Sequence, residues 1–245
     1  MQEKNTKKNT ASSTTSVYID LAKDKIPPNC LDDILVKAIQ EPPGWWGDLA
    51  PMIDGSKTRR QFIEQHKELL YENYSVLFSA GTVKRCPGII NHLASSILIK
   101  SPCDIMIRTN EKNYQWRAPS DILDISYHND NQVGGSLPYH IIKFMLPMCF
   151  KTDSDVQATF IKPIYYKDFG YDLAPGQIET GSSVNQLNII ALFPKKEAEY
   201  FIPADSILAI LQFTKRVSKI KLTNLSEEYA KYEYLRKKYI ASVVK

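Results

Sequence analysis

Histidines and cysteines are the first residues to consider for chemistry, and the chain has four of each. His128 and Asp130, in the run YHND, have the H-x-D spacing of non-haem iron sites, in which two histidines and one carboxylate bind the metal. The only histidine further along the chain is His140, which is too close in sequence to be the usual ligand from a distant strand. The pattern therefore predicts a polar loop and no metal site.

The cysteines and glycine-rich runs also lack the partners that catalysis requires. Cys86 follows Lys84 and Arg85, whose charges can favour a thiolate, but no histidine stands with it in a recognisable motif. No two cysteines have C-x-x-C spacing, so we expect reduced, structural thiols. A G-x-S-x-G motif is absent, and QVGGSLP (132–138) lacks the lysine of a P-loop. These patterns favour a protein that is not an enzyme and uses no cofactor.

One stretch carries residues that suit nucleotide chemistry. GYDL (170–173) and PGQIETG (175–181) resemble two motifs of the deoxyuridine triphosphatases, and the later strand runs resemble the final strand pair of that family. The resemblance implies an all-β fold in which Tyr171, Asp172 and Glu179 bind a nucleotide, with Tyr171 against the base. On this interpretation basic side chains such as Lys167 and Lys215 converge on the same cleft.

Departures from that family weigh against catalysis. Glu179 stands where the family has the aspartate that activates water, and its extra methylene displaces the carboxylate from the position that attack needs. Ser182 stands approximately where the family has the tyrosine that packs on uracil. The phosphate motif and the glycine-rich tail have no counterpart. We therefore expect the stretch to be a strand edge and two turns of a β-clip-like core, with nucleotide binding or hydrolysis as the alternative.

A longer resemblance covers residues 82–216. The runs TVKRCPGIINHLASSILIKSPCDIMI, YQW, IIKFMLPMCFKT and IPADSILAILQFTKR resemble a group of uncharacterised tailed-phage proteins, in which a Cys-Pro turn precedes an SP-x-D-I strand. The resemblance brings no known activity. It implies a viral origin, with the protein in the host cytoplasm or in the virion.

The elements that would position these residues begin with two predicted helices. Residues 31–40 have apolar side chains at the i, i+3, i+4 and i+7 positions of an amphipathic helix, which two prolines then end. Residues 58–70 predict a second helix, capped by Ser56 or Thr58.

Three tryptophans leave a further alternative open. Trp45 and Trp46 lie in a run rich in glycine and proline, and Trp116 lies in a predicted strand. They are either core anchors or, if they form one exposed patch, part of a carbohydrate- or host-protein-binding site.

After residue 73 the chain consists of short apolar or alternating runs bounded by Gly, Pro, Asn or Asp. Their spacing favours a mainly β fold of β-clip or sandwich type over a parallel α/β sheet. Pro147 predicts an edge or a bulge, because proline cannot donate to the ladder. The predicted strands are 74–80, 96–101, 103–109, 114–119, 121–127, 140–152, 156–166, 187–194 and 199–215.

Residues from 224 onward predict a terminal helix, with Ser226 as the N-cap and glutamates in the first turn. An apolar stripe on it is expected to pack on its own domain or on a neighbouring subunit, and we predict an interface there. The stripe consists of Tyr229, Tyr232, Leu235 and Tyr239.

Bulk properties exclude some classes of protein. A chain of 245 residues that is 43% hydrophobic can bury a substantial core. The net charge is only +4, from 31 basic and 27 acidic residues, so nucleic-acid binding is not supported. No apolar run approaches the length of a membrane span, so we expect no membrane partner.

The organisation that follows has four segments. These are a flexible polar arm (1–16), a helical N-terminal segment (17–75), a β-rich core domain (76–222) and a C-terminal helix (223–245). We expect a non-enzymatic structural, assembly or interaction protein of a phage, which forms a homo-oligomer or binds other virion proteins.

Overall fold

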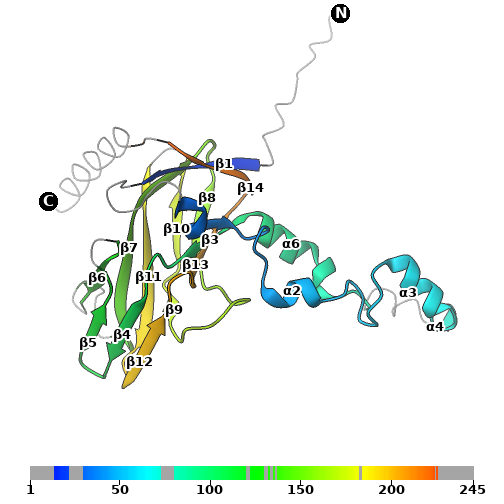
Figure 1. Ribbon diagram of the computed structural model, residues 1–245, viewed down its shortest axis with the longest axis horizontal. Helices are drawn as coiled ribbons and strands as arrows, with labels where there is room; N and C mark the ends of the chain where they lie inside the picture. The colour runs from blue at the N-terminus through cyan, green and yellow to red at the C-terminus, as the bar shows by residue number, and fades with distance from the viewer. Residues whose placement is uncertain are drawn as a thin grey trace, which may run out of the picture.

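The computed structural model describes residues 14–21, 30–72, 80–119, 122–129, 132, 135, 137–181, 184–223 and 225 (Figure 1). Strands in three sheets are the main regular structure, and short helices lie between the first strands. The predicted mainly β class is therefore confirmed. The region of the sheets is named the β body.

The largest sheet has six strands, in the order β14-β1-β7-β11-β9, with β6 paired to β7. The N-terminal strand β1 lies inside this sheet, parallel to β14 and antiparallel to β7. Strand β1, the first described strand, therefore pairs with β14, the last described strand. The strands are β1 (Thr14–Leu21), β6 (Asp124–His128), β7 (Tyr139–Thr152), β9 (Asp172–Leu173), β11 (Asn185–Pro194) and β14 (Arg216–Leu222).

Pro147 lies at an irregularity of β7, as its sequence predicted. On one edge β7 pairs with β6 over Ile141–Met145 and then with β1 over Met148–Thr152. On the other edge the register with β11 shifts between Gln186 and Asn188, which is a bulge opposite Pro147. The missing N–H of proline thus falls where β7 changes partners, and no regular ladder bond is lost.

A second sheet has five antiparallel strands, in the order β10-β8-β13-β3-β2, and a third has three, in the order β12-β4-β5. The five-stranded sheet comprises β2 (Leu35–Lys37), β3 (Ser96–Lys100), β8 (Gln157–Ile161), β10 (Gly176–Glu179) and β13 (Ile207–Phe213). The three-stranded sheet comprises β4 (Ile105–Thr109), β5 (Tyr114–Arg117) and β12 (Ala198–Ile202).

One hydrophobic core joins the three sheets. Its side chains come from the alternate, inward-facing positions of the strands, which is the period that a half-buried strand requires. Phe144 of β7, Ile99 of β3 and Ile107 of β4 represent the three sheets, and each is fully buried. Packing on this core stabilises the whole β body.

A helical extension, residues 41–94, projects from the β body (Figure 1). Its base consists of α2 (Gly44–Asp48) and α6 (Pro87–Ala94), and α6 contacts β3 and β14. A neck follows, in which residues 49–53 and 80–85 run side by side, with Thr82 N donating to Pro51 O over 3.0 Å. The short helix η2 (Val83–Arg85) lies in the second neck segment.

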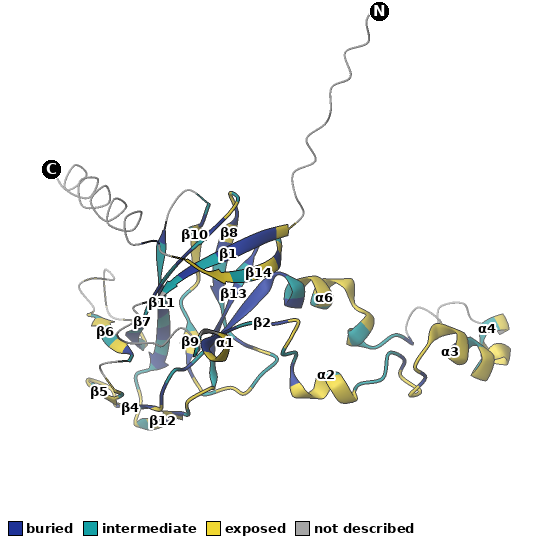
Figure 2. Ribbon diagram, turned by 45° about the horizontal axis from the view of Figure 1, so that its top comes forward, coloured by how far each residue is buried: buried dark blue, intermediate teal, exposed yellow. Residues whose placement is uncertain are grey.

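The tip of the extension, residues 54–72, contains α3 (Arg59–Gln65) and α4 (Lys67–Glu72). Thr58 caps α3 in a capping box with Gln61, so the predicted helix over 58–70 and one of its two predicted caps are confirmed, with a break at His66. Figure 2 shows the tip helices largely exposed, whereas strands such as β7 and β3 of the β body are largely buried or intermediate.

The predicted helix over residues 31–40 is wrong beyond its first turn. The helix α1 spans only Leu31–Ile34, and Leu35–Lys37 then forms β2. Leu35 pairs with Ile99 and Lys37 with Ile97 of β3. Pairing with a buried strand therefore overrides the helical periodicity, because a short apolar run fits either element.

Three predicted segment boundaries differ from the elements seen. Residues 14–16 of the predicted flexible arm belong to β1, and Thr15 and Ser16 are buried. The predicted helical segment (17–75) also contains most of β1 and all of β2, while α6 lies within the predicted β-rich domain. Apart from Thr223 and Leu225, the predicted C-terminal helix lies outside the described residues, as do residues 74–79 of the first predicted strand.

Among the described residues, no helix is long and apolar enough to cross a membrane.

Candidate functional site

Tyr171, the residue predicted to stack on a base, is part of the hydrophobic core. Its side chain is only 4% exposed, and its hydroxyl donates to Leu208 O over 2.8 Å. Its ring packs 5.1 Å from that of Phe193 and 6.4 Å from that of Phe144, between centroids. Burial raises the pKa of the Tyr171 phenol, and the charge of Asp168 raises it further. A side chain buried to this extent is a core residue and not an exposed platform for a nucleotide base.

Asp172 lies in an ion-pair cluster beside Tyr171. Lys162 Nζ is 3.0 Å from Asp172 Oδ1 and 3.0 Å from Asp168 Oδ2. Burial lowers the pKa of Lys162, but its bonds to the two carboxylates outweigh this and raise the pKa overall. Gly170 N donates to Asp168 over 2.8 Å and, together with Lys162, lowers the pKa of that carboxyl. The cluster closes the 162–172 loop, and its two carboxylates share one lysine.

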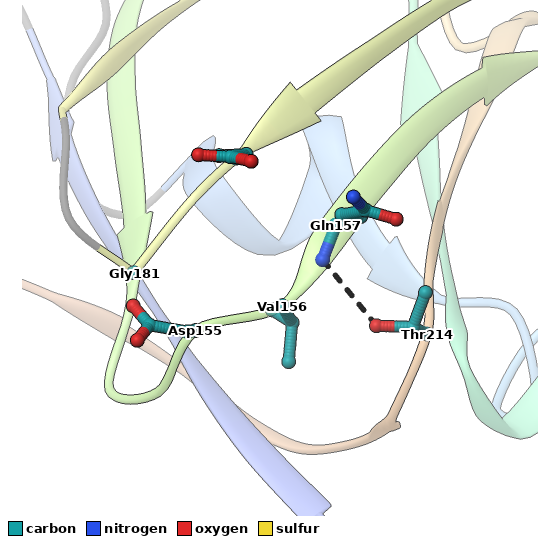
Figure 3. A pocket seen from close by; sticks show the side chains of 6 residues that line it. Asp155, Val156, Gln157, Gly181 and Thr214 are labelled. Carbon is teal, nitrogen blue, oxygen red and sulfur yellow. Dashed lines mark hydrogen bonds between the residues drawn. The ribbon is translucent and has the colours of Figure 1, made fainter.

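Glu179 lines a different cavity, of about 460 Å³, on the five-stranded sheet. Its other lining residues are Asp155, Val156, Gln157, Gly181 and Thr214, and Figure 3 shows the Gln157 backbone N–H donating to the Thr214 hydroxyl, at 3.3 Å. A Cβ on Gly181 would lie 2.6 Å from the Asp155 backbone, so only glycine fits here. Among the described residues, two carboxylates and no basic side chain line the cavity, which is unfavourable for a triphosphate.

The two carboxylates of the nucleotide alternative therefore lie apart. Asp172 is on β9 of the six-stranded sheet, and Glu179 is on β10 of the five-stranded sheet. Lys167 lies 5.2 Å over the Phe169 ring and lines a second cavity, of about 160 Å³, which Tyr171 also lines. Lys215 is next to the first residue of β14 and lines neither cavity. Ser182 lies outside the described residues.

The candidate histidine and cysteine residues lie in different parts of the fold. His128 is on β6, and Asp130 lies outside the described residues. His140 is buried, with Nε2 2.7 Å from Asn110 O. Cys86 is exposed and precedes α6, and none of the four cysteines forms a disulfide. Within the part of the chain that the structure describes, no group of three His, Cys, Asp or Glu side chains could hold a metal ion.

The tryptophans do not form one patch. Trp45 and Trp46, on α2, have ring centroids 5.8 Å apart. The Trp45 ring also lies 6.0 Å from Tyr165, and its Nε1 donates to Tyr165 O over 3.3 Å. These contacts fasten the base of the helical extension to the 162–171 loop. Trp116 lies on β5, which Figures 1 and 2 show in the β body, away from α2.

Trp116 belongs to a second aromatic cluster. Its ring stacks on Tyr114, with centroids 5.9 Å apart, and Tyr114 also contacts Tyr127 and His140. Burial raises the pKa of Tyr114 to about 12, and the neighbouring Tyr127 adds to the effect. This cluster packs β5 against β6 and β7, so we interpret it as a structural contact within the β body.

The predicted interface stripe lies outside the described residues. It consists of Tyr229, Tyr232, Leu235 and Tyr239.

The helical extension shows a feature that sequence reasoning missed. Thirteen large apolar side chains are exposed among the described residues, and six of them lie on the extension, a minority of the described chain. Tyr71 is 94% exposed, Ile53 69% and Leu69 53%. The remaining three are Trp45, Val83 and Ile90. Exposed apolar side chains gathered on one projecting element are typical of a protein interface.

The polar contacts of the tip keep these side chains in place. The Ser56 hydroxyl donates to Gln65 Oε1 over 2.7 Å, and His66 Nε2 lies 2.8 Å from Asp54 Oδ2. Burial raises the pKa of Asp54, but hydrogen bonds from Ser56 and the proximity of His66 outweigh it and lower the pKa overall. The loop before α3 is thereby tied to the end of α3. The tip is an ordered surface.

A sequence signal for this surface existed but was weak. Leu69, Leu70 and Tyr71 are consecutive, and three adjacent positions of a helix cannot all face one core. That pattern indicates an exposed apolar side chain in any helix with a single buried face.

No protein-family model matches the chain, and no curated protein matches it significantly.

Proposed function

We propose that this chain is a non-enzymatic structural or assembly protein that forms a homo-oligomer, in which the helical extension of one subunit packs on a neighbouring subunit. One observation carries the proposal: the extension projects from the β body and exposes nearly half of the large apolar side chains exposed in the described chain. Burying such side chains in a partner is favourable by about 25 cal/mol per Å² of apolar surface.

The small core of the extension supports this proposal. Among the described residues, the tip and neck share a cluster of three buried residues, Met52, Phe62 and Ala80. An element with so little core of its own gains more from a partner surface than the β body does. Closed symmetric oligomers are the usual way in which a chain buries such a surface.

We also propose a β-clip- or sandwich-like class for the β body, which the shared core of its two larger sheets supports. A phage origin, with the protein in the host cytoplasm or the virion and with other virion proteins as partners, rests on the resemblance of residues 82–216.

Light scattering of the purified full chain tests the homo-oligomer. We expect a defined oligomer for the wild type and a monomer for the triple variant Ile53→Ser, Leu69→Ser and Tyr71→Ser. The matched control replaces three exposed apolar residues of the β body, Tyr127→Ser, Ile164→Ser and Phe201→Ser, and should keep the wild-type mass. A monomeric wild type at all concentrations, or an unchanged mass for the tip variant, would contradict the proposal.

The absence of catalysis is tested on the same samples. Incubation with deoxynucleoside triphosphates and magnesium should release no phosphate or pyrophosphate and produce no thermal shift. Turnover that Glu179→Gln abolishes would establish the nucleotide alternative instead.

A further inference from the structure

One run of positive charge lies on and directly before an edge strand. Residues 215–221 contain four basic side chains and no acidic one, which equals the formal net charge of +4 of the whole chain. The rest of the sequence is therefore neutral on balance. The overall composition does not reveal this local run of basic residues, and its position in the fold shows where the charge lies.

The strand that carries the charge is β14, at the edge of the six-stranded sheet. Ser218 is the extra residue of a bulge, because Thr15 pairs with Val217 and Ser16 pairs with Lys219. The bulge keeps Val217 and Ile220 toward the core, while Lys219 and Lys221 are exposed. A basic edge can thus be defined as Lys37, Lys215, Arg216, Lys219 and Lys221.

The contacts of these side chains leave their charges available. Lys37 Nζ, from β2, donates to the carbonyl of Ser218 over 3.3 Å. Arg216 Nη2 donates to Asn91 Oδ1 over 2.6 Å. Within the described part of the chain, no member of the basic edge forms an ion pair. Neutral partners orient the cations without cancelling them.

The two carboxylates of β1 and the end of β7 are already occupied. Asp20 accepts a bond of 2.7 Å from Leu225 N. Asp153 accepts bonds from the Thr15 hydroxyl at 2.9 Å and from Ser16 N at 3.0 Å. Both groups therefore serve the joint between β1, β7 and the end of the chain, and neither pairs with the basic edge.

An aromatic ring completes the surface. Tyr18 of β1 lies between Lys221 of β14 and Lys151 of β7 in the register of the sheet. Lys221 Nζ lies 5.3 Å over the Tyr18 ring. Aromatic rings beside backbone-binding cations are a recurrent arrangement in proteins that bind single-stranded nucleic acids.

We propose that the basic edge binds the phosphate backbone of a nucleic acid without sequence preference. Lysines supply point charges suited to phosphate, and the only cation with a planar fork, Arg216, is engaged by Asn91. The edge strand has no Asn or Gln side chain that could read a base. An acidic protein partner would need apolar contacts as well, and the only exposed large apolar side chain on β14 is that of Leu222.

Lysines on an edge strand also prevent sheets from joining edge to edge. Edge protection and phosphate binding predict different results when the lysines are substituted. If the lysines protect the edge, their substitution produces self-association of the protein. If they contact phosphate, their substitution weakens nucleic-acid binding and reduces the salt dependence of that binding.

Fluorescence anisotropy of the full chain with labelled 20-nucleotide DNA, single-stranded and duplex, tests the proposal between 50 and 200 mM salt. Four phosphate contacts predict that affinity falls by roughly 50- to 150-fold over this range. For the double variant Lys219→Gln and Lys221→Gln, the affinity should fall only about tenfold over the same salt range, because two phosphate contacts remain.

The control variant Lys112→Gln and Lys196→Gln removes the same charge from the turns of the three-stranded sheet. It should bind with the wild-type salt dependence. No binding at 50 mM salt, or an equal effect of the two double variants, would overturn the proposal. Self-association of the edge variant with unchanged DNA affinity would assign the lysines to edge protection. Equal competition by polyglutamate and DNA would assign the edge to an acidic protein partner.

Discussion

The β body and the helical extension differ most in how much hydrophobic core holds each of them. In the part of the chain that the structure describes, thirty buried residues form the core of the β body, whereas the tip and neck of the extension share three. The extension compensates with polar contacts: a capping box at Thr58, the Asp54–His66 pair and the Ser56–Gln65 bond. The comparison teaches that a segment can be well ordered locally and still depend little on the main core.

The same difference indicates separate roles for the two regions: burial in the β body supplies stability, and the exposed side chains of the extension are available for recognition. The β body buries most of its large apolar side chains, and the extension leaves several in solvent (Figure 2). Regions with few buried contacts open at lower free energy than core strands do. We therefore expect the extension to respond to local changes, and the β body to respond as one unit.

Truncation of a core aromatic residue should have the largest effect. Phe144→Ala removes a fully buried ring that packs against Tyr171 and Phe193, and we expect it to lower the free energy of unfolding by about 3–5 kcal/mol. Urea denaturation followed by tryptophan fluorescence measures this change. Phe201→Ala, in which the ring is 51% exposed, is the control and should change it by less than about 0.5 kcal/mol.

The corresponding truncation in the extension should behave differently. Phe62→Ala removes the only buried aromatic ring of the tip cluster, so we expect the amides of α3 to lose hydrogen-exchange protection. The urea midpoint of the β body should stay at the wild-type value. A common shift of both regions would show that the two are one cooperative unit and would remove the distinction.

Removal of the Tyr171 hydroxyl should have the next largest effect. Tyr171→Phe leaves the Leu208 carbonyl without its partner in a buried environment, which costs about 1–3 kcal/mol. Thermal unfolding of the full chain measures the loss. If Tyr171→Phe is as stable as the wild type but abolishes a nucleotide-dependent thermal shift, the residue is a ligand contact and not a core anchor.

Loss of the helix cap should have a smaller and local effect. Thr58→Ala removes the acceptor of the Gln61 backbone N–H, which costs about 1 kcal/mol of helix stability. Hydrogen exchange of the α3 amides should accelerate by roughly fivefold, while the β body is unchanged. Thr58→Ser retains the hydroxyl and is the matched control. Equal exchange rates in both variants would exclude the capping box as a stabilising contact.

Acidification should produce the smallest difference between the two regions. Asp54 in the tip and Asp153 in the β body both have a lowered pKa, because hydrogen bonds to the carboxylates outweigh the effect of burial. A carboxyl with a lower pKa in the folded state stabilises the fold above its unfolded pKa, about 3.9, and this stabilisation is lost as the pH falls through the folded value. The tip has less core to offset the loss.

Hydrogen exchange, corrected for the intrinsic pH dependence, between pH 6 and pH 3 measures this difference. We expect the α3 amides to lose protection below about pH 4, before those of β7. Asp54→Asn should make tip protection low and independent of pH, and Asp153→Asn should leave the tip unchanged. Simultaneous loss in both regions at wild-type carboxyls would contradict the expectation.

The sequence by itself determined the strands of the β body. Short apolar or alternating runs predicted β3, β4, β5, β6, β7 and β11 within a few residues, and the start of β8, because a half-buried strand needs a period of two. The predicted run 199–215 is two strands, β12 and β13, which belong to different sheets. The cap at Thr58 and the irregularity at Pro147 were also readable, because each follows from a local donor or acceptor. These features depend on neighbours in sequence alone.

Only the tertiary structure decided the rest. It made Leu35–Lys37 a strand and drew Thr14–Leu21 into the centre of a sheet, because β3, β7 and β14 offered unpaired edges to these short runs. It separated Asp172 from Glu179, which are seven residues apart in sequence but lie on different sheets. It also gathered the basic edge from β2 and β14. Strand pairing and surface charge join residues that are distant in sequence, and local patterns carry no information on such contacts.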